Sequence, residues 1–478
     1  MRHEDLQIKV PALLHLSRLG YSYLTGDRLR LRERKTNILT DVLQEATERI
    51  NGIRITPERF GCLMDDLQSQ LDTDDLGRQF YGTIRDGWNG LRLIDYEHPE
   101  NNQFQSASEL ACGRGAGSFR PDITLFVNGL PLAMIEVKTG ERPGGLLAEY
   151  DRMLERIHSR EGRRYLQCAQ VWAFSDDHED DPAGFLPAEG TFFATVMTDD
   201  FPLYAIRGKR SGIQPRLLPV TPEEERRILE DNGIRDRPHT RSFQRSLSSR
   251  KPTHRMLSTL FHPERFLFLL RYGIRYVQET DPAGREYMTR RMLTTDQLSV
   301  LRSLTGKAKR GYRNWTFPFC GAAGEEAANA SLIALLRDLE SGAGLYWISP
   351  DETELLRDQA SLRSCGVSCT RYEEATDGQV MMLAAESDLE TALQETEKRS
   401  FTGRSIFILP EPVIQYGQRD ALPAGLRKAD PDAILITRIT NRMPESSSAL
   451  LFSARAGGAL YCYMMTGTEK RAKNLARI

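Results

Sequence analysis

Two short apolar runs separated by Asn128-Gly129 are the clearest pattern of hydrophobic and polar positions along the chain. The runs, at residues 123–127 and 132–137, have the length of buried strands, and Asn-Gly is the strongest short signal for a hairpin turn. The sequence therefore predicts a β-hairpin. Such a hairpin brings the residue before its first strand beside the last residues of its second strand.

The pattern on either side of the hairpin predicts an α/β domain. An amphipathic helix is indicated before Gly20, and a second helix is indicated over residues 144–159. Apolar runs at residues 168–174 and 190–195 predict two further strands. Because strands alternate with a helix here, we expect a mixed sheet in a first domain that spans residues 1–215.

Length and composition indicate a large protein without a strong overall charge. A chain of 478 residues is long enough for two or three domains, and its net charge of −2 leaves nucleic-acid binding to local basic patches. The seven cysteines lack the spacing of a zinc site, which is typical of reduced thiols. No apolar run approaches the roughly 20 residues of a membrane span, and the N-terminus has no apolar signal-peptide core. We therefore expect a cytoplasmic protein without a membrane partner.

A basic, serine-rich segment follows the first domain. Residues 235–252 contain many Arg and Ser residues and few apolar ones, as a flexible linker does. We expect a basic linker over residues 216–260 and a second domain over residues 261–478. A second interpretation stays open, in which the Arg and Lys side chains of this segment neutralise phosphates of a nucleic acid.

Charged side chains stand on both sides of the open end of the predicted hairpin. Asp122 precedes the first strand, and Glu136 and Lys138 lie at the end of the second. Since strand side chains alternate, Glu136 and Lys138 point the same way, whereas Val137 points into the core and offers its carbonyl. Two carboxylates and a carbonyl suit Mg²⁺ or Mn²⁺, and the lysine is placed to orient or deprotonate a water molecule. The alternatives are a structural salt bridge between Glu136 and Lys138, or a solvated surface.

The same region resembles a known family. The segment LIDYEHPENNQF at residues 93–104, followed by RPDITLFVNGLPLAMIEVK at residues 120–138, is similar to the N-terminal nuclease domain of type I restriction enzyme R (motor) subunits. The resemblance implies the PD-(D/E)xK restriction-endonuclease-like fold. In that family the first acid, the second acid and the lysine bind metal and catalyse, and here they fall on Asp122, Glu136 and Lys138.

Two further features of the family are only partly present. Relatives carry a Gln-x-x-x-Tyr helix soon after the lysine, and here Tyr150 occurs without its glutamine. Many relatives also begin with a helix that carries an extra glutamate, for which Glu4 is the candidate. The contributions of Tyr150 and Glu4 to the site therefore stay open. Arg120, two residues before the first acid, is expected to contact a phosphate of the nucleic acid.

The C-terminal half resembles the first RecA-like lobe of the ATPase motor of the same R subunits. The resemblance runs through HPERFLFLLR at residues 262–271, a motor strand and its following helix from residue 344, and LRKADPDAILI at residues 426–436. It implies a RecA-like, P-loop-type α/β lobe in the second domain.

The residues that hydrolyse ATP in such a lobe are missing. Where the family has Gly-Lys-Ser or Gly-Lys-Thr, residues 320–326 read CGAAGEE, and two carboxylates would repel the phosphates. Leu409 and Pro410 stand in place of the metal-ordering and catalytic acids, and residues 440–442 read TNR in place of Thr-Gly-Thr. The sequence also ends before a second RecA lobe. We therefore expect a degenerate lobe that binds no ATP and drives no translocation.

Together these patterns predict a metal-dependent endonuclease that cleaves DNA phosphodiesters as the effector of a restriction or anti-phage defence system. The degenerate lobe is expected to bind DNA or a partner subunit that supplies recognition or activation. Two alternatives stay open. One is a non-catalytic DNA-binding or scaffold subunit of a defence complex, and the other is a nuclease directed against RNA, because the chemistry of the site does not discriminate by sugar.

Overall fold

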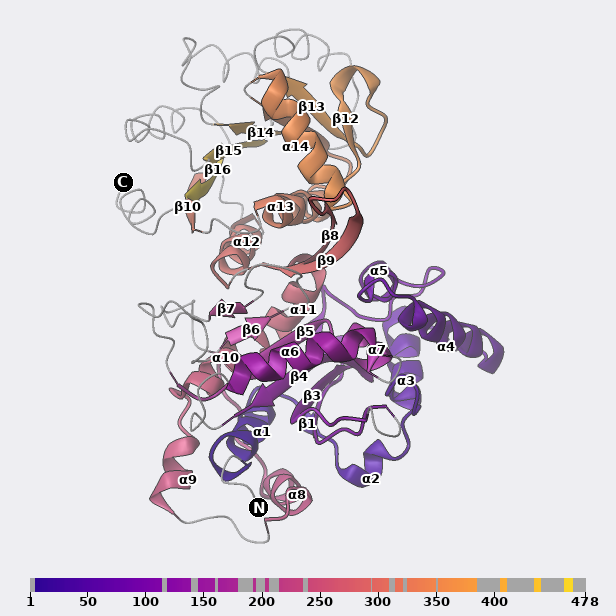
Figure 1. Cartoon of the computed structure of the whole chain (residues 1–478), viewed down its shortest axis with the longest axis vertical. Helices are drawn as coiled ribbons and strands as arrows, with labels where there is room; N and C mark the ends of the chain where they lie inside the picture. The colour runs from indigo at the N-terminus through magenta and orange to yellow at the C-terminus, as the bar shows by residue number, and fades with distance from the viewer. Residues whose placement is uncertain are drawn as a thin grey trace. The chain divides into compact units, whose positions relative to one another are not determined.

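The chain divides into two units, each built around its own seven-stranded sheet (Figure 1). The N-terminal unit comprises residues 1–274 and 288–295, and the C-terminal unit comprises residues 275–287 and 296–478. The computed structural model describes residues 5–113, 118–138, 145–159, 162–178, 192–194, 203–205, 215–234, 240–293, 295–308, 314–320, 325–349, 351–384, 405–410, 434–439 and 460–466.

A mixed sheet forms the centre of the N-terminal unit, as the sequence predicts. Its strands lie side by side in chain order, from β1 to β7. Two neighbouring pairs, β1 with β2 and β4 with β5, are parallel, and the other pairs are antiparallel. The strands are β1 (Ser22–Tyr23), β2 (Phe104–Ser108), β3 (Ile123–Val127), β4 (Leu130–Val137), β5 (Val171–Ser175), β6 (Phe192–Ala194) and β7 (Leu203–Ala205).

The predicted hairpin is strands β3 and β4. Asn128 and Gly129 form its turn with positive φ angles of 53° and 79°, the conformation that Asn-Gly favours. The second strand begins at Leu130, two residues earlier than expected, and the register shifts once between Leu125 and Phe126. Ile123 pairs with Ile135, so the residues just outside that pair come together at the open end of the hairpin.

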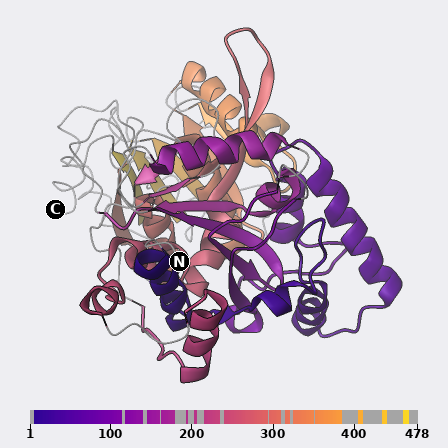
Figure 2. The same ribbon diagram turned by 60° about the horizontal axis from the view of Figure 1, so that its bottom comes forward.

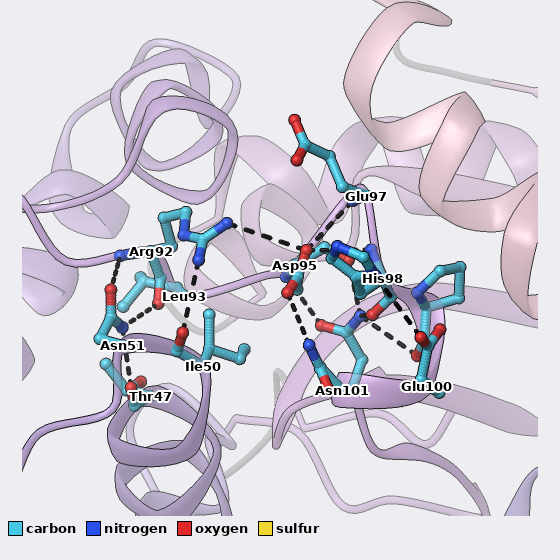
Figure 3. Close-up of polar contacts among 12 residues, drawn as sticks. Thr47, Ile50, Asn51, Arg92, Leu93, Asp95, Glu97, His98, Glu100 and Asn101 are labelled. Atoms are coloured by element: carbon cyan, nitrogen blue, oxygen red, sulfur yellow. Dashed lines mark hydrogen bonds and ion pairs between the residues drawn. The ribbon is translucent and has the colours of Figure 1, made fainter. Parts of the chain in front are cut away.

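The segment at residues 93–104 holds the hairpin turn in place. The side-chain amide of Asn128 donates to the Leu93 carbonyl and to Asn102 Oδ1, both at 2.9 Å. Asp95 orders this segment in turn, because its carboxylate accepts from the backbone of residues 97 and 98 and from Asn101, as Figure 3 shows. The motif that carries part of the family resemblance therefore has a structural role, since it anchors the turn behind the predicted site.

Gly129 is required by this packing, and we expect Gly129→Ala to destabilise the protein by about 2–4 kcal/mol. A Cβ atom there would lie 2.5 Å from the Leu39 carbonyl oxygen, and the φ angle of 79° is already unfavourable for other residues. Gly90 offers a matched control, because it has the same φ, but a Cβ atom on it would meet no other atom within 4 Å. Urea unfolding should give Gly90→Ala a cost of only about 1 kcal/mol; equal costs for the two variants would contradict the packing argument.

Helices flank this sheet, and α6 contacts both β4 and β5. Both ribbon views show α6 running along the sheet (Figures 1 and 2). No helix within the described ranges is long and apolar enough to cross a membrane. The helices of this unit are η1 (Asp5–Lys9), α1 (Val10–Arg18), α2 (Gly26–Leu29), α3 (Thr40–Asn51), α4 (Pro57–Asp72), α5 (Arg78–Asp86), η2 (Pro99–Asn101), α6 (Gly145–His158), α7 (Arg163–Cys168), α8 (Pro222–Asp231), α9 (Arg241–Ser246), α10 (Pro252–Leu260) and α11 (Pro263–Tyr272).

The strand expected over residues 168–174 begins later, at Val171. Cys168 instead ends helix α7, in which Tyr165, Leu166 and Cys168 are buried. A short apolar run fits a buried helix as well as a buried strand, and here α7 packs against α4, α6 and β4.

The structure also differs from the flexible linker expected over residues 216–260. Helices α8, α9 and α10 occupy most of this segment, which belongs to the N-terminal unit. Asp231 accepts from Tyr23 Oη at 2.6 Å, and Asp177 accepts from Lys251 Nζ at 2.6 Å and from the Thr253 backbone at 3.2 Å. Hydrogen bonds with the rest of the unit therefore hold α8 and α10 in place. The low apolar content of the segment had predicted a flexible linker instead.

An all-parallel sheet forms the C-terminal unit, in the strand order β10-β16-β15-β14-β11-β13-β12. The strand expected from residue 344 is β11, and its following helix is α14, in which Leu355 is buried. The strands are β10 (Asn314–Cys320), β11 (Gly344–Ser349), β12 (Cys369–Arg371), β13 (Val380–Ala384), β14 (Ser405–Pro410), β15 (Ile434–Ile439) and β16 (Leu460–Thr466). The helices are α12 (Thr295–Ala308), α13 (Glu325–Leu339), α14 (Glu352–Ser364) and η4 (Tyr372–Glu374), and a separate hairpin consists of β8 (Ile274–Thr280) and β9 (Glu286–Met292).

Candidate functional site

The open end of the β3–β4 hairpin brings Asp122 and Glu136 together. Asp122 immediately precedes β3, Glu136 is the second-last residue of β4, and the pairing of Ile123 with Ile135 places the two acids opposite each other. The carboxylate of Asp122 accepts a hydrogen bond of 2.9 Å from the Val137 backbone N–H. This bond fixes the aspartate against the strand that carries the glutamate.

Lys138 follows β4 directly and turns its ammonium towards both acids. Its Nζ atom lies 3.7 Å from Asp122 Oδ2 and 3.8 Å from Glu136 Oε2. The backbone N–H of Lys138 donates to the Ser175 carbonyl at 2.9 Å, which continues the pairing with β5 and holds the lysine at the strand end. The structure thus brings together the three side chains that the sequence singled out.

Burial dominates the electrostatics of this cluster. The side chain of Glu136 is 4% exposed, whereas those of Asp122 and Lys138 are 13% and 27% exposed. Desolvation raises the pKa of Glu136 well above its ordinary value, and the negative charge of Asp122 raises it further, while the Lys138 ammonium acts in the opposite direction. Two neighbouring acids with little access to water are electrostatically suited to a cation, because a positive charge offsets both their desolvation and their mutual repulsion.

The donor set fits a divalent cation that keeps part of its water shell. Within the ranges given above, no group of three or more His, Cys, Asp or Glu side chains forms a full metal-ligand set. Two carboxylates are nevertheless enough for Mg²⁺, which typically binds through one or two carboxylates and retains several waters. Val137 is buried, as are the other residues of β4, and its carbonyl stays the third expected ligand.

Glu149 is a fourth charged group of the cluster, and the motif at residues 120–138 does not include it. This residue lies in the first turns of α6, and its Oε2 atom is 3.6 Å from Lys138 Nζ. Its side chain is only 7% exposed, and it forms ion pairs with Arg152 and Arg156. One signal was available, because Glu149 directly precedes Tyr150 in the helix expected to contribute to the site.

Tyr150 itself is a core residue. Its ring is buried and packs edge-on against Trp172 and Phe174, with centroid distances of 6.5 and 5.8 Å. Leu146, at the position of the family's glutamine, is also buried. Helix α6 therefore uses these positions to pack on the sheet and presents Glu149 towards Lys138.

The other predicted positions are distributed as follows. Arg120 is exposed, two residues before Asp122. Glu4, residues 321–324 and residues 440–442 lie outside the described residues. Strand β10 ends at Cys320 and α13 begins at Glu325, so the CGAAGEE segment joins these two elements, while Leu409 and Pro410 are the last residues of β14.

The mixed sheet and its group of acids and lysine fit a nuclease-like domain. Residues 1–179 match the family model described as type I restriction enzyme R protein N terminus. The N-terminal region of this chain is therefore similar to that of type I restriction enzyme R proteins, and the match does not extend to the C-terminal unit.

Curated relatives with the same region have consistent names. The type I restriction enzyme HindI endonuclease subunit of Haemophilus influenzae is 31% identical over 152 residues, which cover 26% of this chain and 14% of that protein. The putative type I restriction enzyme MjaIXP endonuclease subunit of Methanocaldococcus jannaschii is 29% identical over 160 residues, which cover 29% of this chain and 15% of that protein. The chain thus spans about one seventh of the length of these relatives.

Proposed function

We propose that this chain is a metal-dependent endonuclease that hydrolyses DNA phosphodiester bonds. The observation that carries the proposal is the convergence of Asp122, Glu136 and Lys138 at the open end of one hairpin. The relatives of the N-terminal region are named as endonuclease subunits of restriction enzymes, which supports a role in restriction or another anti-phage defence. Their designation as subunits also supports partner proteins that supply recognition or activation.

In the proposed mechanism, Asp122 and Glu136 would hold Mg²⁺ or Mn²⁺ together with the Val137 carbonyl. When bound, the cation would lower the pKa of a water molecule and neutralise charge on the phosphate. Lys138 orients the attacking water or takes part in its deprotonation, because its ammonium lies beside both acids. The exposed Arg120 contacts a neighbouring phosphate of the substrate.

The test is cleavage by the full chain in the presence of Mg²⁺ or Mn²⁺, with EDTA as the control. Supercoiled plasmid, linear duplex, single-stranded DNA and RNA should be compared, with and without products of neighbouring genes. We expect metal-dependent cleavage of DNA. Cleavage of RNA alone would replace the proposed substrate, and DNA binding without cleavage under every condition would favour the scaffold alternative.

We also propose that the C-terminal unit is a RecA-like lobe without ATPase activity, which binds DNA or a partner. An all-parallel sheet supports the lobe, and the residues at two motor positions support the loss of activity. The CGAAGEE segment follows the first strand of that sheet and offers no lysine to phosphates, and β14 ends in Leu409-Pro410 where the acids would stand.

This proposal predicts no ATP binding at millimolar nucleotide. Fluorescence titration with a labelled ATP analogue, and a phosphate-release assay with DNA present, should both give the signal of buffer alone. Saturable binding in the micromolar range would contradict the proposal, as would DNA-stimulated hydrolysis above that of a heat-inactivated sample.

A further inference from the structure

Lys138 lies among three carboxylates, of which only two belong to the proposed cation site. Its Nζ atom is 3.7 Å from Asp122 Oδ2, 3.8 Å from Glu136 Oε2 and 3.6 Å from Glu149 Oε2. Under the proposed function, on which this inference rests, Asp122 and Glu136 hold a divalent cation. The ammonium and the cation therefore compete for the same carboxylate oxygens, since two positive charges on one acid pair repel each other.

Glu149 is held by different parts of the protein from the other two acids. Asp122 and Glu136 belong to the hairpin, whereas Glu149 projects from α6 across the same end of the sheet. Arg152 Nη2 pairs with Oε2 of Glu149, and Arg156 Nη1 lies 3.8 Å from Oε1. These ion pairs come from α6 itself, so they hold the carboxylate independently of the hairpin acids.

These arginines also argue against Glu149 as a direct ligand of the cation. Each of its two oxygens already has a guanidinium within ion-pair distance. A further divalent charge at the same carboxylate would be opposed by both arginines. Lys138, in contrast, carries a single charge on a flexible side chain and reaches Glu149 from the end of β4.

We propose that Glu149 is a positioning residue for Lys138. It gives the ammonium a partner outside the cation's own ligands, so that Lys138 stays beside the site while Asp122 and Glu136 bind a divalent cation. Without Glu149, the ammonium would pair with the hairpin acids alone and would oppose binding of the cation.

A double-mutant cycle on metal affinity tests this role without depending on cleavage. The affinity of the full chain for Mn²⁺ is measured by titration calorimetry for wild type, Glu149→Gln, Lys138→Met and the double variant. We expect Glu149→Gln to weaken Mn²⁺ binding about tenfold, as loss of an outer-shell partner commonly does. Lys138→Met should bind Mn²⁺ at least as tightly as wild type, and the double variant should match Lys138→Met, because Glu149 then has no lysine to hold.

Three results would overturn the inference. If Glu149→Gln weakens Mn²⁺ binding in the Lys138→Met background as well, Glu149 is a ligand of the cation. If Glu149→Gln leaves the Mn²⁺ affinity unchanged, Glu149 has no role in binding. If the wild-type chain binds no Mn²⁺, there is no competition between the Lys138 ammonium and a cation. Glu155→Gln, an exposed acid on the same helix, is the matched control and should leave the affinity unchanged. If Glu149 and Lys138 are coupled in Mn²⁺ binding but no nucleic acid is cleaved, only the proposed nuclease is refuted. If nucleic acid is cleaved but the two residues are not coupled in Mn²⁺ binding, only the role of Glu149 is refuted.

Discussion

Asp122→Ala is expected to abolish DNA cleavage, with a loss of at least about 10³-fold, and Lys138→Ala to reduce it by about 10²–10⁴-fold. Asp122 is one of two carboxylates at the proposed cation site, so its removal leaves the buried Glu136 as the only acid of the hairpin facing the metal. Lys138 is the cation of the protein nearest to both acids among the contacts described. Single-turnover cleavage of a plasmid at saturating enzyme measures both effects on the rate constant.

The two variants should differ in metal binding, which separates their roles. Asp122→Ala removes a ligand and is expected to lose Mn²⁺ binding, whereas Lys138→Ala retains it. Asp151→Ala is a suitable control, because Asp151 is an exposed acid on α6. Circular dichroism establishes that each variant is folded. Wild-type cleavage rates in Asp122→Ala would refute the assignment of this hairpin as the site.

Glu136→Gln is expected to stabilise the metal-free protein by about 1–3 kcal/mol while removing its activity. The wild-type carboxyl is buried beside Asp122, and an amide of the same shape avoids the cost of a second negative charge there. The same substitution should abolish stabilisation by Mg²⁺, which in wild type reaches about 2.7 kcal/mol at 100 times the dissociation constant. Thermal unfolding with EDTA and with Mg²⁺ measures both quantities.

The stabilising effect of Glu136→Gln should depend on pH in a defined direction. Burial and Asp122 raise the pKa of Glu136 in the folded state above its ordinary value of 4.5. The protonated carboxyl therefore contributes its full stability below pH 4.5, and this contribution is lost as the pH rises towards the folded-state pKa. Gln does not titrate, so the advantage of Glu136→Gln grows as the pH rises from 4.5. An advantage that shrinks over this interval, or one shared by the exposed Glu155→Gln, would contradict the argument.

The hairpin and the arrangement of its acids were predictable from the sequence because they depend on local rules. Asn128-Gly129 favours positive φ at both positions, and the alternation of strand side chains places Glu136 and Lys138 on the same side. Once Ile123 pairs with Ile135, the register of the hairpin places Asp122 beside Glu136. The resemblance of residues 120–138 to the R-subunit nuclease motif points to the same three residues, Asp122, Glu136 and Lys138.

Glu149 and the helices over residues 216–260 were not predictable in the same way. Glu149 reaches Lys138 only because α6 packs on β4 and β5 through residues such as Tyr150, and these long-range contacts set the position of the helix on the sheet. The basic segment has few apolar residues, yet Asp177 pairs with Lys251 and caps the start of α10 from a distant part of the chain. Such contacts join residues more than 70 positions apart.

The sequence by itself determined the turn, the two strands and the place of Asp122, Glu136 and Lys138 at the open end of the hairpin, because each follows from residue type and short-range periodicity. Only the tertiary structure decided that Glu136 is buried, that Lys138 stands among three acids, and that α6 brings Glu149 to the site. The physical reason is that burial and charge proximity arise from packing between distant segments, and these long-range contacts set the electrostatics on which the proposed chemistry depends.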